Sequence, residues 1–130
     1  RVLAATDVGQ IIDPARLHGQ LYGCFGSAGL DTALFEESIL DREKGYMLNP
    51  NMVDYKWRTF PEMPPMENLI LETPMASHRF KAVGVGEIST SPGPGAVLMA
   101  VSNALGTRMQ AYPITPDRVL RAAQKSRKSR

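Results

Sequence analysis

Cysteine is nearly absent from this sequence: Cys24 is the single one in 130 residues. One cysteine can neither form an internal disulfide nor supply a multi-cysteine metal site, which excludes a disulfide-stapled extracellular scaffold and a zinc or iron–sulfur centre belonging to this chain. The sequence also lacks an apolar run approaching the roughly 20 residues that cross a bilayer, and no basic-then-apolar leader begins it. We therefore expect a cytoplasmic protein without a membrane partner.

The sequence also lacks a large excess of charge of one sign, since the formal net charge is only +2. The positive excess lies largely in residues 121–130, which hold Arg121, Lys125, Arg127, Lys128 and Arg130. Such a run can bind nucleic acid or a membrane, but no aromatic residues are interleaved for base stacking. We predict a solvated basic tail over residues 121–130 and no nucleic-acid partner.

Spaced metal ligands are missing as well. His18 and His78 are far apart and neither belongs to a His-x-x-x-His or Glu-x-x-His pattern, so ordinary surface or capping roles are expected and no metal site is predicted. Cys24 has no histidine at helical spacing, which favours a buried structural thiol over a reactive one.

The apolar pattern predicts an α+β fold that forms one segment over residues 1–120. A buried strand over residues 2–8 ends in a polar residue, and Asp13-Pro14 begins a long helix as N-cap and first helical position. The other predicted elements are a hairpin at 38–48, an irregular proline-rich connection at 49–65, a strand at 68–73, a helix from 96 to 105 closed by Gly106, a short strand at 109–112 and a helix from Pro116 to about Gln124 with Thr115 as N-cap. Because the chain starts at Arg1, in the middle of what reads as a strand, we expect a fragment or a processed subunit.

The long helix predicted over residues 14–36 carries an unusual number of glycines. Gly19, Gly23 and Gly26 recur at spacings of four and three, which places them on one face, and Gly29 interrupts the helix again. Each costs about 1 kcal/mol against alanine in a helix. Either a flat ligand or a backbone approaches this face closely, or another helix packs on it through small residues.

Glu87 is an isolated carboxylate in a glycine-rich apolar stretch. Gly84 and Gly86 precede it and Ile88 follows it, with no cation nearby in the sequence. Desolvation raises the pKa of a carboxyl, which makes a glutamate an effective base near neutral pH, and the glycines would let the loop press against a cofactor. The alternatives are that Glu87 caps the following helix or pairs with a distant arginine.

Five stretches, in this order, resemble the molybdopterin-binding large subunit of the xanthine dehydrogenase and aldehyde oxidase family, which are molybdenum hydroxylases. They are DVGQIIDP at residues 7–14, GQLYG at 19–23, LNPNMVDYK at 48–56, VGVGE at 83–87 and PITPDRVL at 113–120. The resemblance covers nearly the whole chain and implies that its strands and helices form the C-terminal portion of a molybdopterin-binding domain. One local departure is Ile88-Ser89-Thr90, where the family usually has prolines.

The resemblance also implies roles for individual residues. Glu87 matches the family's catalytic base, which activates a water-derived nucleophile for attack on an aldehyde or an N-heterocycle, while the cofactor accepts the two electrons of the oxidation. Gln20 matches the glutamine that lies against the pterin. Gly23 and Gly26 are expected to let that helix approach the cofactor, and Gly86 is also assigned to cofactor binding. The implied cofactor is molybdopterin with molybdenum, in the cytosine dinucleotide form, shared with the remainder of the molybdenum subunit; [2Fe–2S] and FAD are implied on an iron–sulfur subunit and a FAD subunit.

On this interpretation the chain is inactive alone and supplies the base and one wall of a site for a small-molecule substrate. The competing hypotheses are a non-catalytic assembly module of such a complex and a free-standing small-molecule-binding domain. Retention of Glu87 and its glycine neighbours favours the enzyme component.

Overall fold

The computed structural model describes residues 1–128 and divides the chain into two compact units. The first unit consists of Arg1–Leu30 and Arg58–Gly93, and the second consists of Asp31–Trp57 together with the chain from Pro94 onward. Helices and strands alternate irregularly along the chain, which confirms the α+β prediction. The single molybdopterin-binding segment predicted over residues 1–120 stays a prediction.

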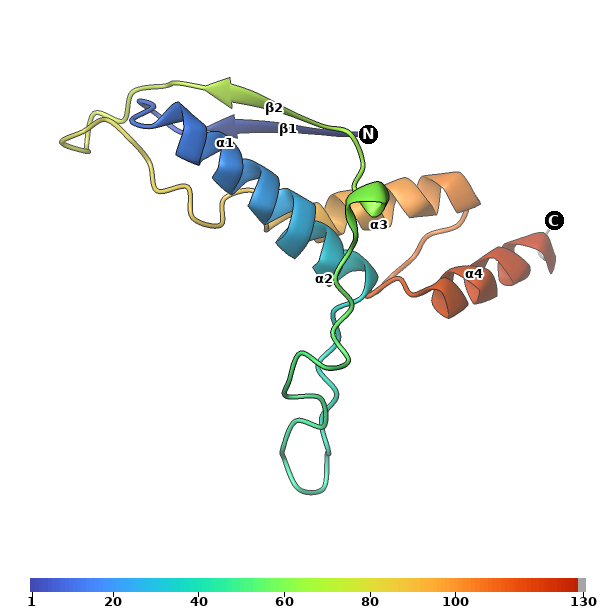
Figure 1. The fold of residues 1–130 in the computed structure, drawn as a ribbon. Helices are drawn as coiled ribbons and strands as arrows, with labels where there is room; N and C mark the ends of the chain where they lie inside the picture. The colour runs from blue at the N-terminus through green and yellow to red at the C-terminus, as the bar shows by residue number, and fades with distance from the viewer. Residues whose placement is uncertain (129–130) are drawn as a thin grey trace. The chain divides into compact units, whose positions relative to one another are not determined.

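The first unit contains a two-stranded parallel sheet. Strand β1 (Val2–Asp7) lies beside strand β2 (Met66–Leu71), with Val2 opposite Met66 and Asp7 opposite Leu71 (Figure 1). Burial alternates along both strands, as expected where one face of a sheet is covered. Both predicted strands are confirmed, although β2 begins two residues before the predicted start and ends before Thr73.

Asp7 is the last residue of β1 and lies at the carboxyl end of the parallel sheet. Its Oδ1 accepts hydrogen bonds from the backbone amides of Gly9 at 3.2 Å and Thr73 at 3.0 Å. Hydrogen bonding from the Thr73 side chain, followed by the amides of Thr73 and Gly9, lowers the pKa of Asp7 below its ordinary value of 3.8, because these donors favour the charged form. The polar residue expected at the end of β1 therefore ties β1 to the segment after β2.

This arrangement predicts an acid-dependent loss of stability. A carboxyl whose pKa is lowered by folding contributes stability above its unfolded pKa, and the contribution disappears as the pH falls through the folded pKa. In Asp7→Asn this part of the decline should be missing, so the free energy of unfolding should change less steeply between pH 5 and pH 2 than in the wild type. Denaturant unfolding across that range measures the difference. Glu43→Gln, in an exposed turn, is the control; equal slopes for wild type and Asp7→Asn would contradict the prediction.

The long predicted helix is present but is not uniformly α-helical. Helix α1 (Pro14–Gly23) begins as predicted, since Asp13 Oδ1 accepts the Arg16 amide at 3.1 Å and Pro14 occupies the first turn. A π-helical segment, η1 (Cys24–Gly29), and a short helix, α2 (Leu30–Leu34), continue it. Glycine weakens regular helix, and π-helical turns insert one extra residue where the regular pattern is interrupted.

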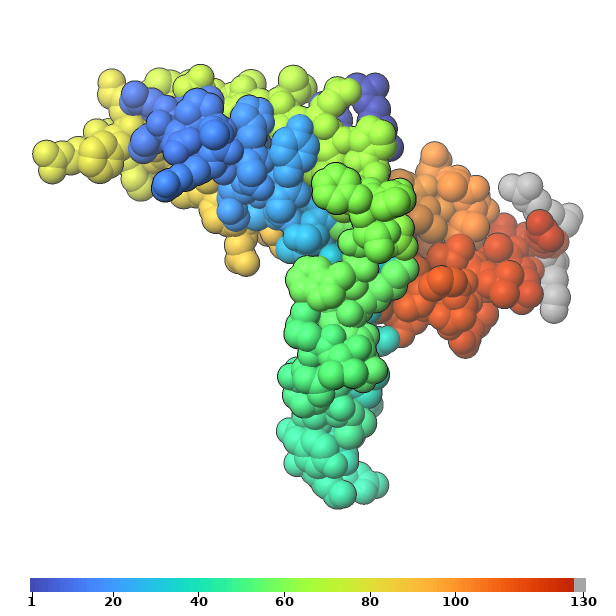
Figure 2. All heavy atoms as spheres, viewed as in Figure 1, coloured from blue at the N-terminus to red at the C-terminus, as the bar shows by residue number. Residues whose placement is uncertain are grey.

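The core of the first unit lies between α1 and the sheet. Leu17 and Leu21, four residues apart on one face of α1, are buried with Val8, and full burial of such side chains stabilises by about 1.5–3 kcal/mol each. Four partly buried side chains pack against this cluster: Ile11, Ile70, Val85 and Ile88. In the space-filling view the blue atoms of α1 lie directly beside the yellow-green atoms of β2 (Figure 2).

Between α2 and β2, the chain is mostly irregular. In the second unit the predicted hairpin at 38–48 is reduced to a turn and one antiparallel bridge, Leu40 to Met47, with Gly45 at φ +74°. The predicted turn and antiparallel pairing are confirmed by this bridge and by backbone hydrogen bonds from Leu48 to Ile39 and from Asp41 to Tyr46. The two predicted strands are not formed, because the pairing does not continue beyond one bridge. The proline-rich connection is irregular as predicted, apart from the 3-10 turn η2 (Phe60–Glu62) in the first unit.

Two helices complete the chain. Helix α3 (Pro92–Leu105) starts four residues before the predicted start and ends as predicted at Gly106, which has φ +63°. Helix α4 (Pro116–Lys128) runs beyond its predicted end, so residues 121–128 of the expected basic tail are helical; residues 129–130 lie outside the described residues. Thr115 Oγ1 donates to Asp117 Oδ1 in the first turn of α4.

The strand predicted at residues 109–112 is not formed. The amide of Met109 donates to Ser102 Oγ at 2.9 Å, and the amide of Ile114 donates to the carbonyl of Ala33 at 2.7 Å. Backbone donors that are satisfied in this way leave no ladder for a strand. Within residues 1–128, no helix is both long and apolar enough to span a membrane.

Candidate functional site

The loop at residues 82–87 is anchored at its start by the segment that follows β1. The amide of Val83 donates to the carbonyl of Val8 at 3.0 Å. Gly9 has φ +63°, and a β-carbon at this position would lie 2.4 Å from the Lys81 carbonyl oxygen. Only glycine fits here without a shift of the backbone, so DVG in the first motif is explained by this close approach.

The other end of the loop is held by two side chains of the helical segment. The Gln20 side-chain amide donates to the carbonyl oxygen of Gly86, and the Cys24 thiol donates to the same oxygen at 2.8 Å. Gln20 Nε2 also lies 3.1 Å from Cys24 Sγ. Because Gln20 and Cys24 are four residues apart, they present their polar atoms on one side of the helix.

The residues after Glu87 contact the same helical segment. The Thr90 amide donates to the Glu87 carbonyl at 3.0 Å, and Thr90 Oγ1 donates to the Cys24 carbonyl at 3.4 Å. Farther along, a β-carbon built on Gly93 would lie 2.7 Å from the α-carbon of Gly29, so two backbones meet without side chains between them. The chain from Gly86 to Gly93 is thus laid along the end of α1 and η1.

The three residues that replace the family's usual prolines all have defined places. Ile88 packs against the core cluster, and Ser89 is only 3% exposed. The Ser89 hydroxyl has no hydrogen-bond partner among the described residues. Thr90 makes the two bonds already given. Packing accommodates Ile88 and hydrogen bonding accommodates Thr90, whereas the buried Ser89 hydroxyl is unpaired among the described residues.

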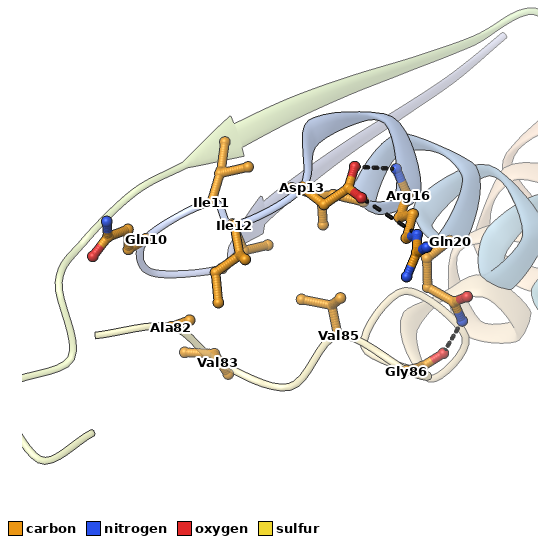
Figure 3. Close-up of a pocket in the computed structure, with 12 residues that line it drawn as sticks. Gln10, Ile11, Ile12, Asp13, Arg16, Gln20, Ala82, Val83, Val85 and Gly86 are labelled. Carbon is orange, nitrogen blue, oxygen red and sulfur yellow. Dashed lines mark hydrogen bonds and ion pairs between the residues drawn. The ribbon is translucent and has the colours of Figure 1, made fainter. Parts of the chain in front are cut away.

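A cavity of about 350 Å³ lies between the first half of α1 and the start of this loop. Figure 3 shows the side chains of Ile11, Ile12, Val83 and Val85 around it, with the Asp13–Arg16 pair and the Gln20–Gly86 bond along one side. The lining is mostly apolar, with charged groups at one side only. Such a composition suits an apolar or flat group with a polar edge.

Glu87 itself is exposed, which corrects the expectation that its carboxylate is surrounded by apolar groups. The apolar neighbours Val85 and Ile88 pack against the core instead, and they leave Glu87 on the outside of the loop. Among residues 1–128, the carboxylate takes part in no hydrogen bond or ion pair. Neither the capping role nor the arginine partner considered from the sequence is therefore found in the described part of the chain.

The glycines on the face shared by α1 and η1 have different surroundings. β-carbons built on Gly19 and Gly23 would meet nothing within 4 Å, whereas one on Gly26 would lie 2.8 Å from the side-chain methyl of Met63. Gly84 and Gly86 are open in the same way as Gly19 and Gly23. Gly26 therefore makes room for a methionine, which corrects the expectation that it lets the helix approach the cofactor. A β-carbon on any of the other four glycines would meet no described residue within 4 Å.

The other residues that the sequence singled out lie away from Glu87 or contact its loop. Cys24 is buried, as the sequence predicted, and its thiol donates to the Gly86 carbonyl. His18 and His78 are exposed, and His18 stacks near the ring of Tyr22 with 6.5 Å between centroids. In the part of the chain that the structure describes, no group of three acidic, histidine or cysteine side chains could hold a metal ion.

Sequence reasoning missed the convergence of Cys24 and Thr90 on the Glu87 loop. The helical spacing of Gln20 and Cys24 indicates that their side chains are neighbours, but no local pattern shows that both meet the carbonyl of Gly86, 62 residues after Cys24 in the chain. Contacts of this range depend on the tertiary fold alone.

Known proteins are similar to this chain in sequence and in fold. Residues 1–64 match the model of the molybdopterin cofactor-binding domain. The chain is 35% identical over 119 residues to a xanthine dehydrogenase molybdenum-binding subunit of Escherichia coli, and 36% identical over 121 residues to an aldehyde oxidoreductase molybdenum-binding subunit of the same species. Each alignment covers 92% of this chain and 16% of the relative, so the chain spans about a sixth of the length of these proteins.

Solved structures agree with these relatives. Quinoline 2-oxidoreductase from Pseudomonas putida superposes with a TM-score of 0.80 at 31% identity, covering 95% of this chain and 16% of that one. CO dehydrogenase from Oligotropha carboxidovorans superposes with a TM-score of 0.82 at 25% identity, covering 98% and 16%. By sequence motifs, domain match and fold together, the chain belongs to the molybdenum hydroxylase family of xanthine dehydrogenases and aldehyde oxidoreductases, and it corresponds to a small part of their molybdenum-binding subunit.

Proposed function

We propose that this chain, as the C-terminal part of a molybdenum-binding subunit, supplies the general base and one wall of the active site of a molybdenum hydroxylase. The substrate class is an aldehyde or an N-heterocycle, and the oxygen added to it comes from water. One observation carries the proposal: Glu87 presents an exposed, unpaired carboxylate at the end of a loop whose backbone is fixed on both sides of it.

The residues around Glu87 fit a molybdopterin. A β-carbon built on Gly23 of α1 or on Gly86 beside Glu87 would meet no described residue within 4 Å, and it would occupy the space that a flat ring needs. Gln20 lies between them, with its amide directed at the Gly86 carbonyl. We therefore assign Gln20, Gly23 and Gly86 to the cofactor-facing wall.

The role of Gln20 in this wall is partly indirect. Its amide nitrogen is engaged with Gly86 and approaches Cys24, so it braces the loop, while its side-chain oxygen remains free to accept a bond from a cofactor donor. The chain's own contribution is thus to hold a bare backbone surface and a carboxylate in fixed relation to each other.

The bound cofactor would supply the two-electron oxidation that no side chain of this protein can perform. Glu87 would accept a proton from the water-derived nucleophile, for which a free carboxylate oxygen within hydrogen-bond reach suffices. The apolar side chains of the cavity behind the loop would help to exclude water from that side. The remaining walls belong to the rest of the subunit in this proposal.

The proposed partners follow from the size of the chain. Because it spans about a sixth of its relatives, the remainder of the molybdenum subunit must complete the site, and the chain alone should be inactive. A further relative is named as the gamma subunit of a 6-hydroxypseudooxynicotine dehydrogenase complex, which supports a multi-subunit assembly. We propose an iron–sulfur subunit with [2Fe–2S], a FAD subunit, the cytosine dinucleotide form of molybdopterin, and a cytoplasmic location.

The second candidate function is a non-catalytic assembly module with the same fold. It would be favoured if the exposed carboxylate had a structural partner, but none of the described residues supplies one. The unpaired state of Glu87 therefore favours the catalytic role.

The proposal is tested by following the source of the oxygen. The complete enzyme that contains this chain is incubated with benzaldehyde, xanthine and quinoline in water labelled with oxygen-18. At least one of them should be oxidised, and the product should carry the label from water. The same reaction in ordinary water under labelled dioxygen is the control and should give unlabelled product. An enzyme loaded with molybdenum that oxidises none of them, or that takes its oxygen from dioxygen, would contradict the proposal.

A further inference from the structure

We propose that Cys24 is a positioning residue for Glu87, a role that rests on the proposed function and that neither the family match nor the sequence motifs assign. The inference starts from the place of Cys24 in the fold. It is the first residue of η1, it is 6% exposed, and it contacts the chain on both sides of Glu87.

The first contact acts on the peptide plane that leads into Glu87. The Cys24 thiol donates to the carbonyl oxygen of Gly86 at 2.8 Å. A peptide unit is planar, so the direction of the Gly86 carbonyl also sets the direction of the Glu87 amide and the position of its α-carbon. Holding this one oxygen therefore orients the residue that bears the carboxylate.

That constraint matters because the loop has little else to restrict it at this point. Gly84 and Gly86 have no β-carbons and meet nothing within 4 Å, so their backbone can adopt many more orientations than other residues allow. Two donors converge on the Gly86 oxygen, the Cys24 thiol and the Gln20 amide, and they select one orientation. Gln20 Nε2 also lies 3.1 Å from the sulfur, which links the two donors.

The second contact acts on the chain after Glu87. Thr90 Oγ1 donates to the Cys24 carbonyl at 3.4 Å, and the Thr90 amide donates to the Glu87 carbonyl at 3.0 Å. Cys24 thus bonds to Gly86, before Glu87, through its side chain, and to Thr90, after Glu87, through its main-chain carbonyl. The π-helical turn that starts at Cys24 departs from regular helix at the same place, as is frequent where a helix serves a functional site.

The closing experiment compares three variants in the complete molybdenum enzyme, with benzaldehyde, xanthine or quinoline as substrate, whichever it oxidises. Cys24→Ala removes the donor, and kcat should fall by about 10- to 100-fold at equal molybdenum content with KM within a factor of about two, since a misplacement of about 1 Å can cost 10²-fold. Cys24→Ser keeps a donor and should recover most of the rate. Ser27→Ala removes a hydroxyl from the same segment that bonds only to Gly23 within the helix, and it should behave as wild type.

A readout independent of turnover accompanies these rates. Hydrogen–deuterium exchange of peptides covering residues 84–93 should be faster in Cys24→Ala than in wild type, and it should return towards wild type in Cys24→Ser. Unchanged kcat and exchange in Cys24→Ala would overturn the inference. So would a Cys24→Ser variant as slow as Cys24→Ala with wild-type exchange, because the role would then be packing of the sulfur.

Glu87→Gln in the same enzyme separates the two proposals. If Glu87→Gln is inactive and Cys24→Ala is normal, the positioning role fails while the proposed function survives. If Glu87→Gln keeps its activity, the proposed function fails and Cys24 has no catalytic carboxylate to position.

Discussion

Glutamine at position 87 should leave the complete enzyme with its full molybdenum content and slow the reduction of the enzyme by substrate by about 10²–10⁴-fold, the usual range for removal of a general base. The amide matches the carboxylate in size and can form hydrogen bonds, but it cannot accept the proton. Because Glu87 is exposed and bonded to none of the described residues, its replacement should not disturb the fold. Rapid mixing with substrate in the absence of oxygen measures the rate directly.

The matched control for this substitution is Glu67→Gln. Glu67 is also an exposed glutamate of the first unit, and its ion pair with Arg1 has both side chains more than half exposed, so its loss should be nearly neutral. Rates for Glu87→Gln and wild type within a factor of about three, well short of a general base's contribution, would leave the assembly module as the better interpretation.

Leucine at position 23 is expected to prevent most of the cofactor from being retained. A β-carbon at Gly23 would meet no described residue within 4 Å, so we expect a leucine there to clash mainly with what the rest of the enzyme brings to this face. Alanine is a better helix former than glycine by about 1 kcal/mol, so Gly23→Ala should not lower the stability of the helix. Molybdenum per subunit should therefore decrease from glycine through alanine to leucine while the thermal stability of the cofactor-free protein does not decrease.

The comparison with Gly26 makes the Gly23 result specific. A β-carbon at Gly26 would contact the side chains of Met63 and Met66, so a leucine there should destabilise the chain itself, by about 1–3 kcal/mol as is usual for overpacking. Full molybdenum occupancy in Gly23→Leu would show that the glycine face of α1 does not meet the cofactor.

Several elements could be predicted because their signals are local. Asp13 and Pro14 begin α1 through one side-chain bond and one fixed backbone angle, and Gly106 ends α3 with a positive φ. Elements that need a partner were less predictable. The strand expected at 109–112 and the hairpin strands at 38–48 contain suitable residues, but a strand exists only where a second segment completes its hydrogen bonds.

For the candidate site, the sequence by itself determined the family, the candidate base and the spacing of the glycines. These depend on residue identity and order, since the VGVGE stretch and the GQLYG stretch can be recognised without knowing where they lie in space. The choice between open and occupied glycines, by contrast, could not be made from their spacing.

Only the tertiary structure decided that Glu87 is exposed and that Gln20, Cys24 and Thr90 hold its loop. These are contacts between residues 62 or more positions apart, and they exist because β1 pairs in parallel with β2 and the returning chain is then laid along α1 and η1. Apolar neighbours in the sequence suggested a desolvated carboxylate, but Val85 and Ile88 are drawn into the core by the hydrophobic effect and leave Glu87 in solvent. Burial depends on which side of the chain meets another element, and that is settled only when the chain has folded.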